Sequence, residues 1–124
     1  RLPELGRHPA EAVRAFFIKH QDRILFGSDF ISSSNGMQLG SVWHVPGRKP
    51  GIDDALRFYE THWAYFETHG KQIDHPTPIQ GDWKVDAIGL PEGVLRKLYR
   101  SNADKLIFEP LRPLAALGPQ GGNL

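Results

Sequence analysis

The sequence contains no cysteine, so neither a disulfide framework nor a thiolate site can contribute to the fold or the chemistry. This absence favours a reducing compartment such as the cytoplasm without excluding an exported protein. Charge of one sign is also lacking, because 15 Lys and Arg balance 14 Asp and Glu and no basic run exceeds two residues. We therefore expect no nucleic-acid partner and no anionic membrane surface as a partner.

No apolar run approaches the about 20 residues that span a bilayer, so we expect no transmembrane helix. The 124 residues, 40% hydrophobic and 23% charged, are typical of one soluble globular domain. The first residue is Arg1 and not methionine, which leads us to expect further chain upstream.

Three segments have the periodicity of amphipathic helices. Residues 8–22 place Val13, Phe16 and Phe17 on one face behind Pro9. Residues 52–69 and 91–107 follow, the first ending before a glycine and the second beginning at a proline. The expected apolar stripes are Leu56, Tyr59, Trp63 and Phe66 in the former, and Leu95, Leu98 and Tyr99 in the latter. We expect the latter helix to bend or restart near Ser101 and Asn102.

One segment, "ILFGSDF" at 24–30, predicts a strand over 23–29. Ile24, Leu25 and Phe26 are consecutive, so their side chains would point to both faces, as in a strand covered on both sides by helices or other strands. No second comparable run exists, because the alternation at 83–87 is short and half polar. Neighbouring strands must then come from another chain or from a larger domain.

Residues 30–51 contain four glycines and two prolines without a sustained period, which predicts a long loop with a functional role. The tail over 109–124 is rich in proline and glycine, and we expect it to run irregularly over the surface.

Two motifs in this order, "DRILFGSDF" (22–30) and "LPEGVLRKLYRSNADKLI" (90–107), resemble the C-terminal end of metal-dependent hydrolases of the amidohydrolase superfamily, in the amidohydrolase-related branch. The resemblance covers residues 9–108. It implies an α/β fold in which residues 1–108 form the C-terminal segment of a (β/α)8 TIM-type barrel, helix-rich with one main strand when isolated. Strand 23–29 would be the last of the barrel, 30–51 a lid-like loop, and 52–69 and 91–107 the closing helices, the latter with its Asn102–Ala103 step.

The same resemblance implies that Asp29 ligates a divalent metal ion, which we expect to be zinc, and that it exchanges protons with the attacking water. Catalytic groups of such barrels lie at the C-terminal ends of the strands. The alternative from the residues alone is that Asp29 merely closes a turn after Gly27 and Ser28. The sequence departs from the family where Ser28 replaces the usual threonine and where Phe30 and Ile31 follow in place of a proline.

The His-x-His pair of the first barrel strand and the histidines of the middle strands are absent, so the metal site is incomplete and the isolated chain is expected to be inactive. His62 and His69 are seven residues apart, about 10.5 Å along a helix, and cannot easily share one zinc ion. Loop residues Phe30, Trp43, His44 and His75 are further candidates for substrate contact, with packing or solvation as the alternative.

The sequence therefore predicts part of a metal-dependent hydrolase that activates water against a small carbonyl-type substrate, namely an ester, a lactone or an amide. Its other partner would be the N-terminal part of the same barrel. One alternative is metal-dependent, non-oxidative decarboxylation of a carboxylate substrate on the same barrel. Another is a non-catalytic helical interaction module.

Overall fold

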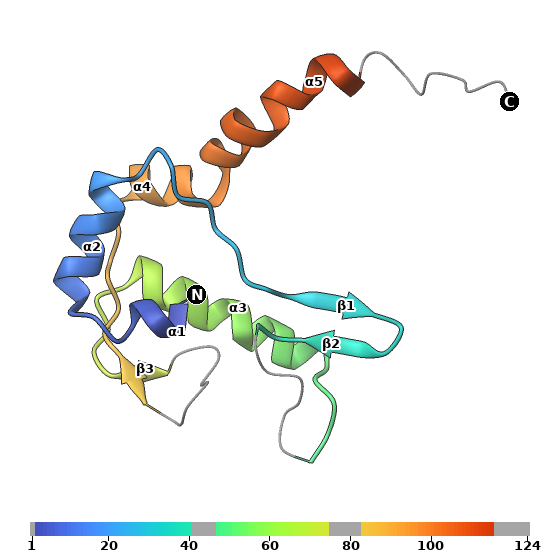
Figure 1. Ribbon diagram of the computed structural model, residues 1–124. Coiled ribbons are helices and arrows are strands. Elements are labelled where there is room, and N and C mark those ends of the chain that lie inside the picture. Colours follow the sequence, from blue (N-terminus) through green and yellow to red (C-terminus); the bar gives the residue numbers. More distant parts are fainter. Residues whose placement is uncertain (1, 41–46, 75–82, 116–124) are drawn as a thin grey trace, which may run out of the picture.

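A computed structural model describes residues 2–40, 47–74 and 83–115, and it combines helices with short strands (Figure 1). The N-terminal half contains α1 (Leu2–Leu5), α2 (Ala10–Lys19), β1 (Ile31–Ser33), β2 (Gly36–Gln38) and α3 (Ile52–Glu67). The C-terminal half contains β3 (Ile73–Asp74), β4 (Lys84–Val85), α4 (Glu92–Arg96), η1 (Lys97–Ser101), η2 (Asp104–Phe108) and α5 (Glu109–Ala115).

The strands form two separate antiparallel pairs. In the first, Ile31 lies opposite Gln38 and Ser33 opposite Gly36, so β1 and β2 make a tight hairpin. The Ser33 hydroxyl accepts a hydrogen bond from the Asn35 N–H at 3.2 Å, which fixes the turn, and Gly36 adopts a φ of 120° that suits glycine. The second pair joins Ile73 to Val85 and Asp74 to Lys84.

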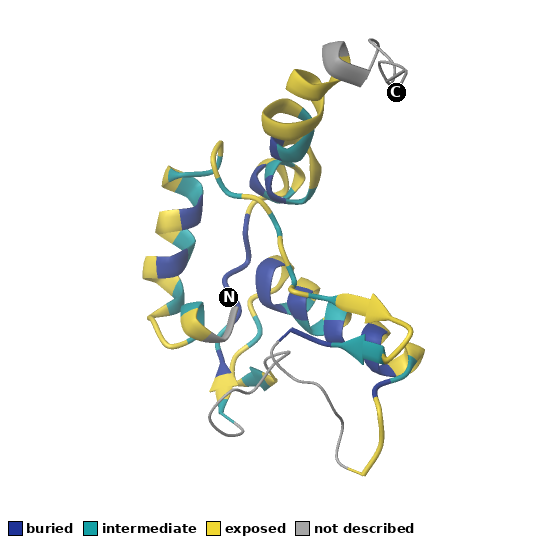
Figure 2. Ribbon diagram, turned by 45° about the vertical axis from the view of Figure 1, so that its right-hand side comes forward, coloured by how far each residue is buried: buried dark blue, intermediate teal, exposed yellow. Residues whose placement is uncertain are grey.

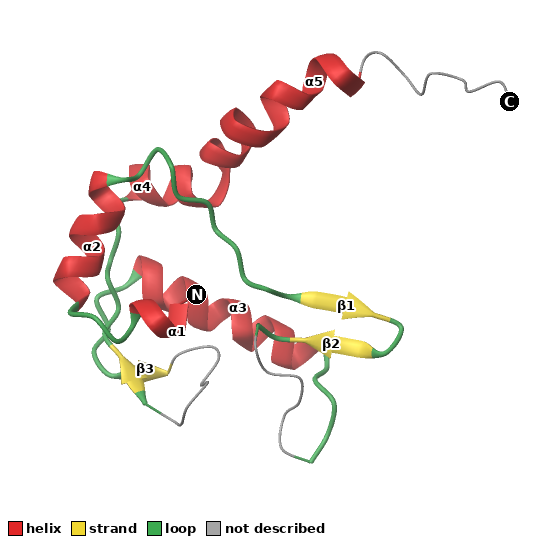
Figure 3. Cartoon of the chain, in the orientation of Figure 1, coloured by secondary structure: helices red, strands yellow, loops and turns green. Residues whose placement is uncertain are grey.

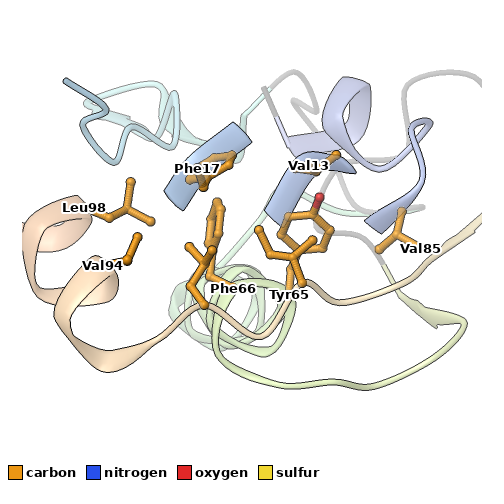
Figure 4. Close-up of a cluster of buried hydrophobic side chains, with 9 residues drawn as sticks. Val13, Phe17, Tyr65, Phe66, Val85, Val94 and Leu98 are labelled. Atoms are coloured by element: carbon orange, nitrogen blue, oxygen red, sulfur yellow. The ribbon is translucent and has the colours of Figure 1, made fainter. Parts of the chain in front are cut away.

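The main core lies where α2, α3, α4 and the loop before α4 meet (Figure 4). Phe17 of α2 packs on Phe66 of α3 with ring centroids 5.6 Å apart. Nine buried side chains make up this core: Val13, Phe17, Tyr65, Phe66, Val85, Ile88, Leu90, Val94 and Leu98. A smaller cluster of Leu39, Ala55 and Phe58 attaches the β1–β2 hairpin to α3.

The backbone carbonyls at the end of α3 accept hydrogen bonds from residues 88–90, which precede α4. The N–H groups of Ile88 and Leu90 donate to the carbonyls of Tyr65 and Phe66 at 2.8 and 2.7 Å. These carbonyls would otherwise lack partners at a helix C-terminus. Gly89, between them, has a φ of 50°, and a Cβ there would lie 2.1 to 2.5 Å from ring atoms of His69.

The predicted helices form, but the apolar faces differ in part from the prediction. Helix α3 spans 52–67 and buries Phe58, His62, Tyr65 and Phe66, whereas Leu56 and Trp63 of the expected stripe are 55% and 45% exposed. Phe16 of α2 is also exposed. Helix α3 carries apolar residues on two adjacent faces, so its periodicity alone does not identify the face that packs.

The expected strand at 23–29 is not formed in the described chain. Residues 24–30 have no regular secondary structure (Figure 3), because the part of the molecule that the structure describes offers them no strand to pair with. The Phe26 N–H donates instead to the Leu98 carbonyl at 3.0 Å. The expected lid-like loop at 30–51 is likewise partly regular, since it contains the β1–β2 hairpin.

The tail prediction was wrong for residues 109–115, which form α5. The chain is continuously helical from Glu92 to Ala115 and does not restart at Ser101 and Asn102; it widens into looser turns at Lys97–Ser101 and Asp104–Phe108. The Glu109 N–H bonds to the Asp104 carbonyl, five residues back. This wide turn precedes Pro110, whose ring would otherwise clash with a carbonyl of the preceding turn.

Candidate functional site

Burial alternates from one residue to the next along the extended segment 24–30. Ile24, Phe26, Ser28 and Phe30 are half-buried, whereas Leu25, Gly27 and Asp29 are exposed. This period of two is that of a strand, although no strand pairs with the segment in the described chain. Figure 2 shows half-buried and exposed positions following one another along this segment.

The half-buried residues of the segment contact helix α3. Phe26 meets the His62 ring edge-on at 5.7 Å, and Phe30 lies 5.9 Å from the Tyr59 ring. Between them, the hydroxyls of Ser28 and Tyr59 are 3.1 Å apart and share a hydrogen bond. The segment thus runs along α3, with Phe26 at His62 and both Ser28 and Phe30 at Tyr59, about one turn earlier.

Asn102, in the helix that runs from Glu92 to Ala115, holds the N-terminal end of the segment 24–30. This side chain is only 4% exposed, and its amide nitrogen donates to the carbonyls of Gln21 at 2.7 Å and Ile24 at 2.8 Å. Nearby, Lys97 forms an ion pair with Asp22 at 2.7 Å, and this pair lowers the pKa of that carboxyl. The two motifs that carry the family resemblance are therefore in direct contact.

Asp29 lies at the end of this segment with an exposed side chain and a φ of 59°. Aspartate tolerates this left-handed conformation better than most residues. The turn is closed by the Ser28 hydroxyl, which accepts a hydrogen bond from the Phe30 N–H at 3.3 Å. Asp29 is thus an exposed turn residue, so the turn role and the ligand role are compatible.

The described residues do not complete a metal site around Asp29. Among residues 2–40, 47–74 and 83–115, no group of three or more His, Cys, Asp or Glu side chains could hold a metal ion. Structural and catalytic zinc sites use at least three protein ligands. The donor set described here therefore does not fit a zinc ion by itself, and further ligands would have to come from elsewhere.

Of the residues expected to contact substrate, Phe30 is half-buried against Tyr59. Trp43, His44 and His75 lie outside the described residues. The lid-like loop is fixed at its C-terminal end by Arg48, which binds both oxygens of Asp54, with 2.7 Å from Nη2 to Oδ1. Asp54 Oδ2 also accepts from the Gly51 N–H at 2.7 Å, and these donors hold the pKa of Asp54 well below its usual range.

The residue that the sequence did not single out as part of a site is His62. It is 5% exposed, and its Nδ1 lies 2.8 Å from the Phe58 carbonyl. Since a carbonyl only accepts, Nδ1 carries the proton and Nε2 is an acceptor in the neutral ring. Burial lowers the pKa of His62, so the ring is neutral at pH 7. In the sequence, His62 lies one helical turn after Phe58 and three residues after Tyr59, and this spacing was the available signal that His62 packs among aromatic residues.

In comparisons with known proteins, no family model, no curated protein and no solved structure matches this chain significantly. Within the described residues, no helix has the length and apolar character required to cross a membrane.

Proposed function

We propose that this chain is the C-terminal part of a (β/α)8 barrel enzyme of the amidohydrolase type, with 23–29 as a barrel strand and Asp29 at its catalytic end. The intact enzyme would hydrolyse a small carbonyl-type substrate, an ester, a lactone or an amide. In that reaction the Asp29 carboxylate would accept a proton from the attacking water and later return it to the leaving group.

The observation that carries this proposal is the exposed position of Asp29 at the end of a segment that packs along α3. In a barrel, one side of each strand is covered by the outer helices and the other faces the barrel interior, where the catalytic groups stand at the strand ends. Phe26 and Ser28 contact α3, whereas Asp29, at the end of the segment, is exposed. A carboxylate that exchanges protons with water at the end of a barrel strand must be accessible in this way.

A second observation is apolar surface that the described chain leaves uncovered. Leu25 is 39% exposed, and Leu56 and Trp63 are exposed along α3. Beyond Asn102, the helix that runs from Glu92 to Ala115 is largely exposed (Figure 2), and its exposed apolar residues are Leu106, Ile107, Phe108 and Leu111. Exposed apolar surface of this kind usually marks an interface, which fits contact with the rest of a barrel.

The metal belongs to the same proposal. When bound, a divalent ion such as zinc would supply water activated at neutral pH. The described residues offer Asp29 and do not fit the ion alone, so the remaining ligands would lie in an upstream part of the parent chain.

The coding sequence upstream of Arg1 provides the test. We expect an in-frame barrel half with a His-x-His strand, and an extended protein that binds metal and hydrolyses members of an ester, lactone and amide panel. In that protein, Asp29→Asn should lower turnover about a hundredfold or more, whereas Asp53→Asn, an exposed carboxylate in the first turn of α3, should not.

Near-normal turnover of the Asp29→Asn enzyme would reject the catalytic role of Asp29. Carbon dioxide release from carboxylate substrates without hydrolysis would favour the decarboxylase. An upstream start codon with no barrel half would favour an interaction module and contradict the enzyme.

A further inference from the structure

A cavity of about 170 Å³ lies beside the extended segment, between it and the helical core. The rings of Phe17, Phe26 and Phe66 line it, together with aliphatic side chains and Gly27. A Cβ at Gly27 would meet no atom within 4 Å, so the space continues up to the backbone there. Apolar cavities of about 150 Å³ admit benzene-sized molecules.

His62 also lines this cavity and gives it a polar group. Its Nδ1 is occupied by the Phe58 carbonyl, which leaves Nε2 with a lone pair and, within the described part of the chain, no hydrogen-bonding partner. The residue is only 5% exposed, and an acceptor that borders an apolar cavity gains from a donor brought by a ligand. A bound molecule should therefore carry an O–H or N–H group.

Charge on such a molecule is disfavoured. None of the described lining residues is an acid, a lysine or an arginine, so an ion entering the cavity would lose water without gaining a counter-charge. A neutral donor avoids this cost.

The aromatic walls favour a flat ring. Phe26 and Phe66 meet edge-to-face with centroids 6.2 Å apart, and Phe26 meets His62 in the same way at 5.7 Å. Aromatic rings add attraction in such geometries beyond the area that they bury. A small aromatic ring that bears one neutral donor matches both the walls and the imidazole.

We propose that this cavity binds a small, uncharged aromatic alcohol of the phenol class, with its hydroxyl donating to Nε2 of His62. Asp29 takes no part in this site. A cavity that does not bind phenol would therefore leave the proposed hydrolase role of Asp29 untouched, and rejection of that role would leave the phenol site untouched.

Phenol and toluene, two molecules of similar shape of which only phenol has a donor, provide the test on the 124-residue chain. We expect saturable phenol binding that moves the ¹⁵N resonance of His62 Nε2, and toluene binding about tenfold weaker. His62→Phe retains an aromatic ring without the acceptor, and it should weaken phenol about tenfold while leaving toluene unchanged.

Gly27→Val should fill the cavity and abolish the binding of both molecules without touching His62, because the backbone at Gly27 has no positive φ. Gly93→Ala is the matched control, since a Cβ at Gly93 also meets nothing within 4 Å and this residue lies in α4, outside the cavity lining. Equal affinities for phenol and toluene, an unmoved Nε2 resonance, no binding of either molecule, or unchanged binding in Gly27→Val would each overturn the proposal.

Discussion

The side-chain amide of Asn102 donates to the backbone carbonyl of Ile24 at 2.8 Å, across 78 residues of sequence. The same nitrogen donates to the Gln21 carbonyl at 2.7 Å, so one buried side chain holds both the turn after α2 and the start of the extended segment. Asn102 thereby fixes where the residues leading to Asp29 begin. These two hydrogen bonds give a physical reason for an asparagine at position 102.

Asn102→Ala should destabilise the chain by about 1 to 3 kcal/mol, since two hydrogen bonds are lost and two partly buried carbonyls lose their donor. Urea unfolding followed by circular dichroism measures this loss. Asn35→Ala, at the exposed tip of the β1–β2 hairpin, is the control and should change stability by less than about 0.5 kcal/mol. Equal unfolding midpoints for the two variants would show that Asn102 is not an anchor.

Helix positions were predictable from the sequence because they depend on local periodicity. Val13 and Phe17 in α2, and Leu98 in the closing helix, are buried as the pattern indicates. In α3, by contrast, Trp63 and Phe66 belonged to one expected stripe, yet only Phe66 is buried. The choice between two apolar faces depends on the elements that arrive from elsewhere in the chain, which periodicity does not contain.

Pairing and long-range contacts were not predictable for the same reason. The apolar run Ile24–Phe26 predicts a strand, but a strand requires a neighbour, and the described chain supplies none. The contact of Ser28 with Tyr59, 31 residues away, and the neutral, buried state of His62 likewise follow from tertiary packing. The prediction that Asp29 is catalytic stays a prediction.

Gly89→Ala should be strongly destabilising, by more than the about 1 to 2 kcal/mol that a left-handed conformation costs an ordinary residue. The added Cβ would also overlap the His69 ring and disturb the N–H groups that satisfy the end of α3. Thermal unfolding measures the loss.

The double variant Gly89→Ala with His69→Ala separates the two causes, because it removes the overlap and leaves the backbone strain. We expect it to recover part of the stability. Gly93→Ala, at an unstrained helical position with open space, should be neutral or stabilising. A Gly89→Ala protein as stable as Gly93→Ala would contradict the packing at this loop.

The isolated 124-residue chain should neither bind zinc with submicromolar affinity nor hydrolyse esters or amides, because Asp29 does not belong to any three-ligand group in the described residues. Calorimetric titration with zinc measures this directly. A stoichiometric, submicromolar site would contradict the incomplete site and turn attention to His44 and His75, whose alanine variants would then identify the ligands.

The pair of Asp54 with Arg48 should make stability depend on acidity. The Arg48 guanidinium and then the Gly51 N–H lower the pKa of Asp54 in the folded chain below its unfolded value of about 3.9. A lowered folded pKa means that the stabilisation is complete above about pH 5 and declines as pH falls through 4 and below, because the unfolded state then binds more protons. Melting temperatures from pH 2 to 7 should therefore fall on the acid side.

The variant Asp54→Asn isolates this contribution from other carboxylates whose pKa is also lowered, such as Asp86 beside Gln72 and Lys71. It should be less stable than the parent at pH 7, and the difference between the two proteins should shrink as the solution is acidified toward pH 2. Asp53→Asn, the exposed neighbour in the same helical turn, is the control for loss of a carboxylate at the start of α3. A difference between the parent and Asp54→Asn that stays constant from pH 7 to 2 would mean that the charge of Asp54 does not stabilise the fold, and that Arg48 does not fix the end of the 30–51 loop through it.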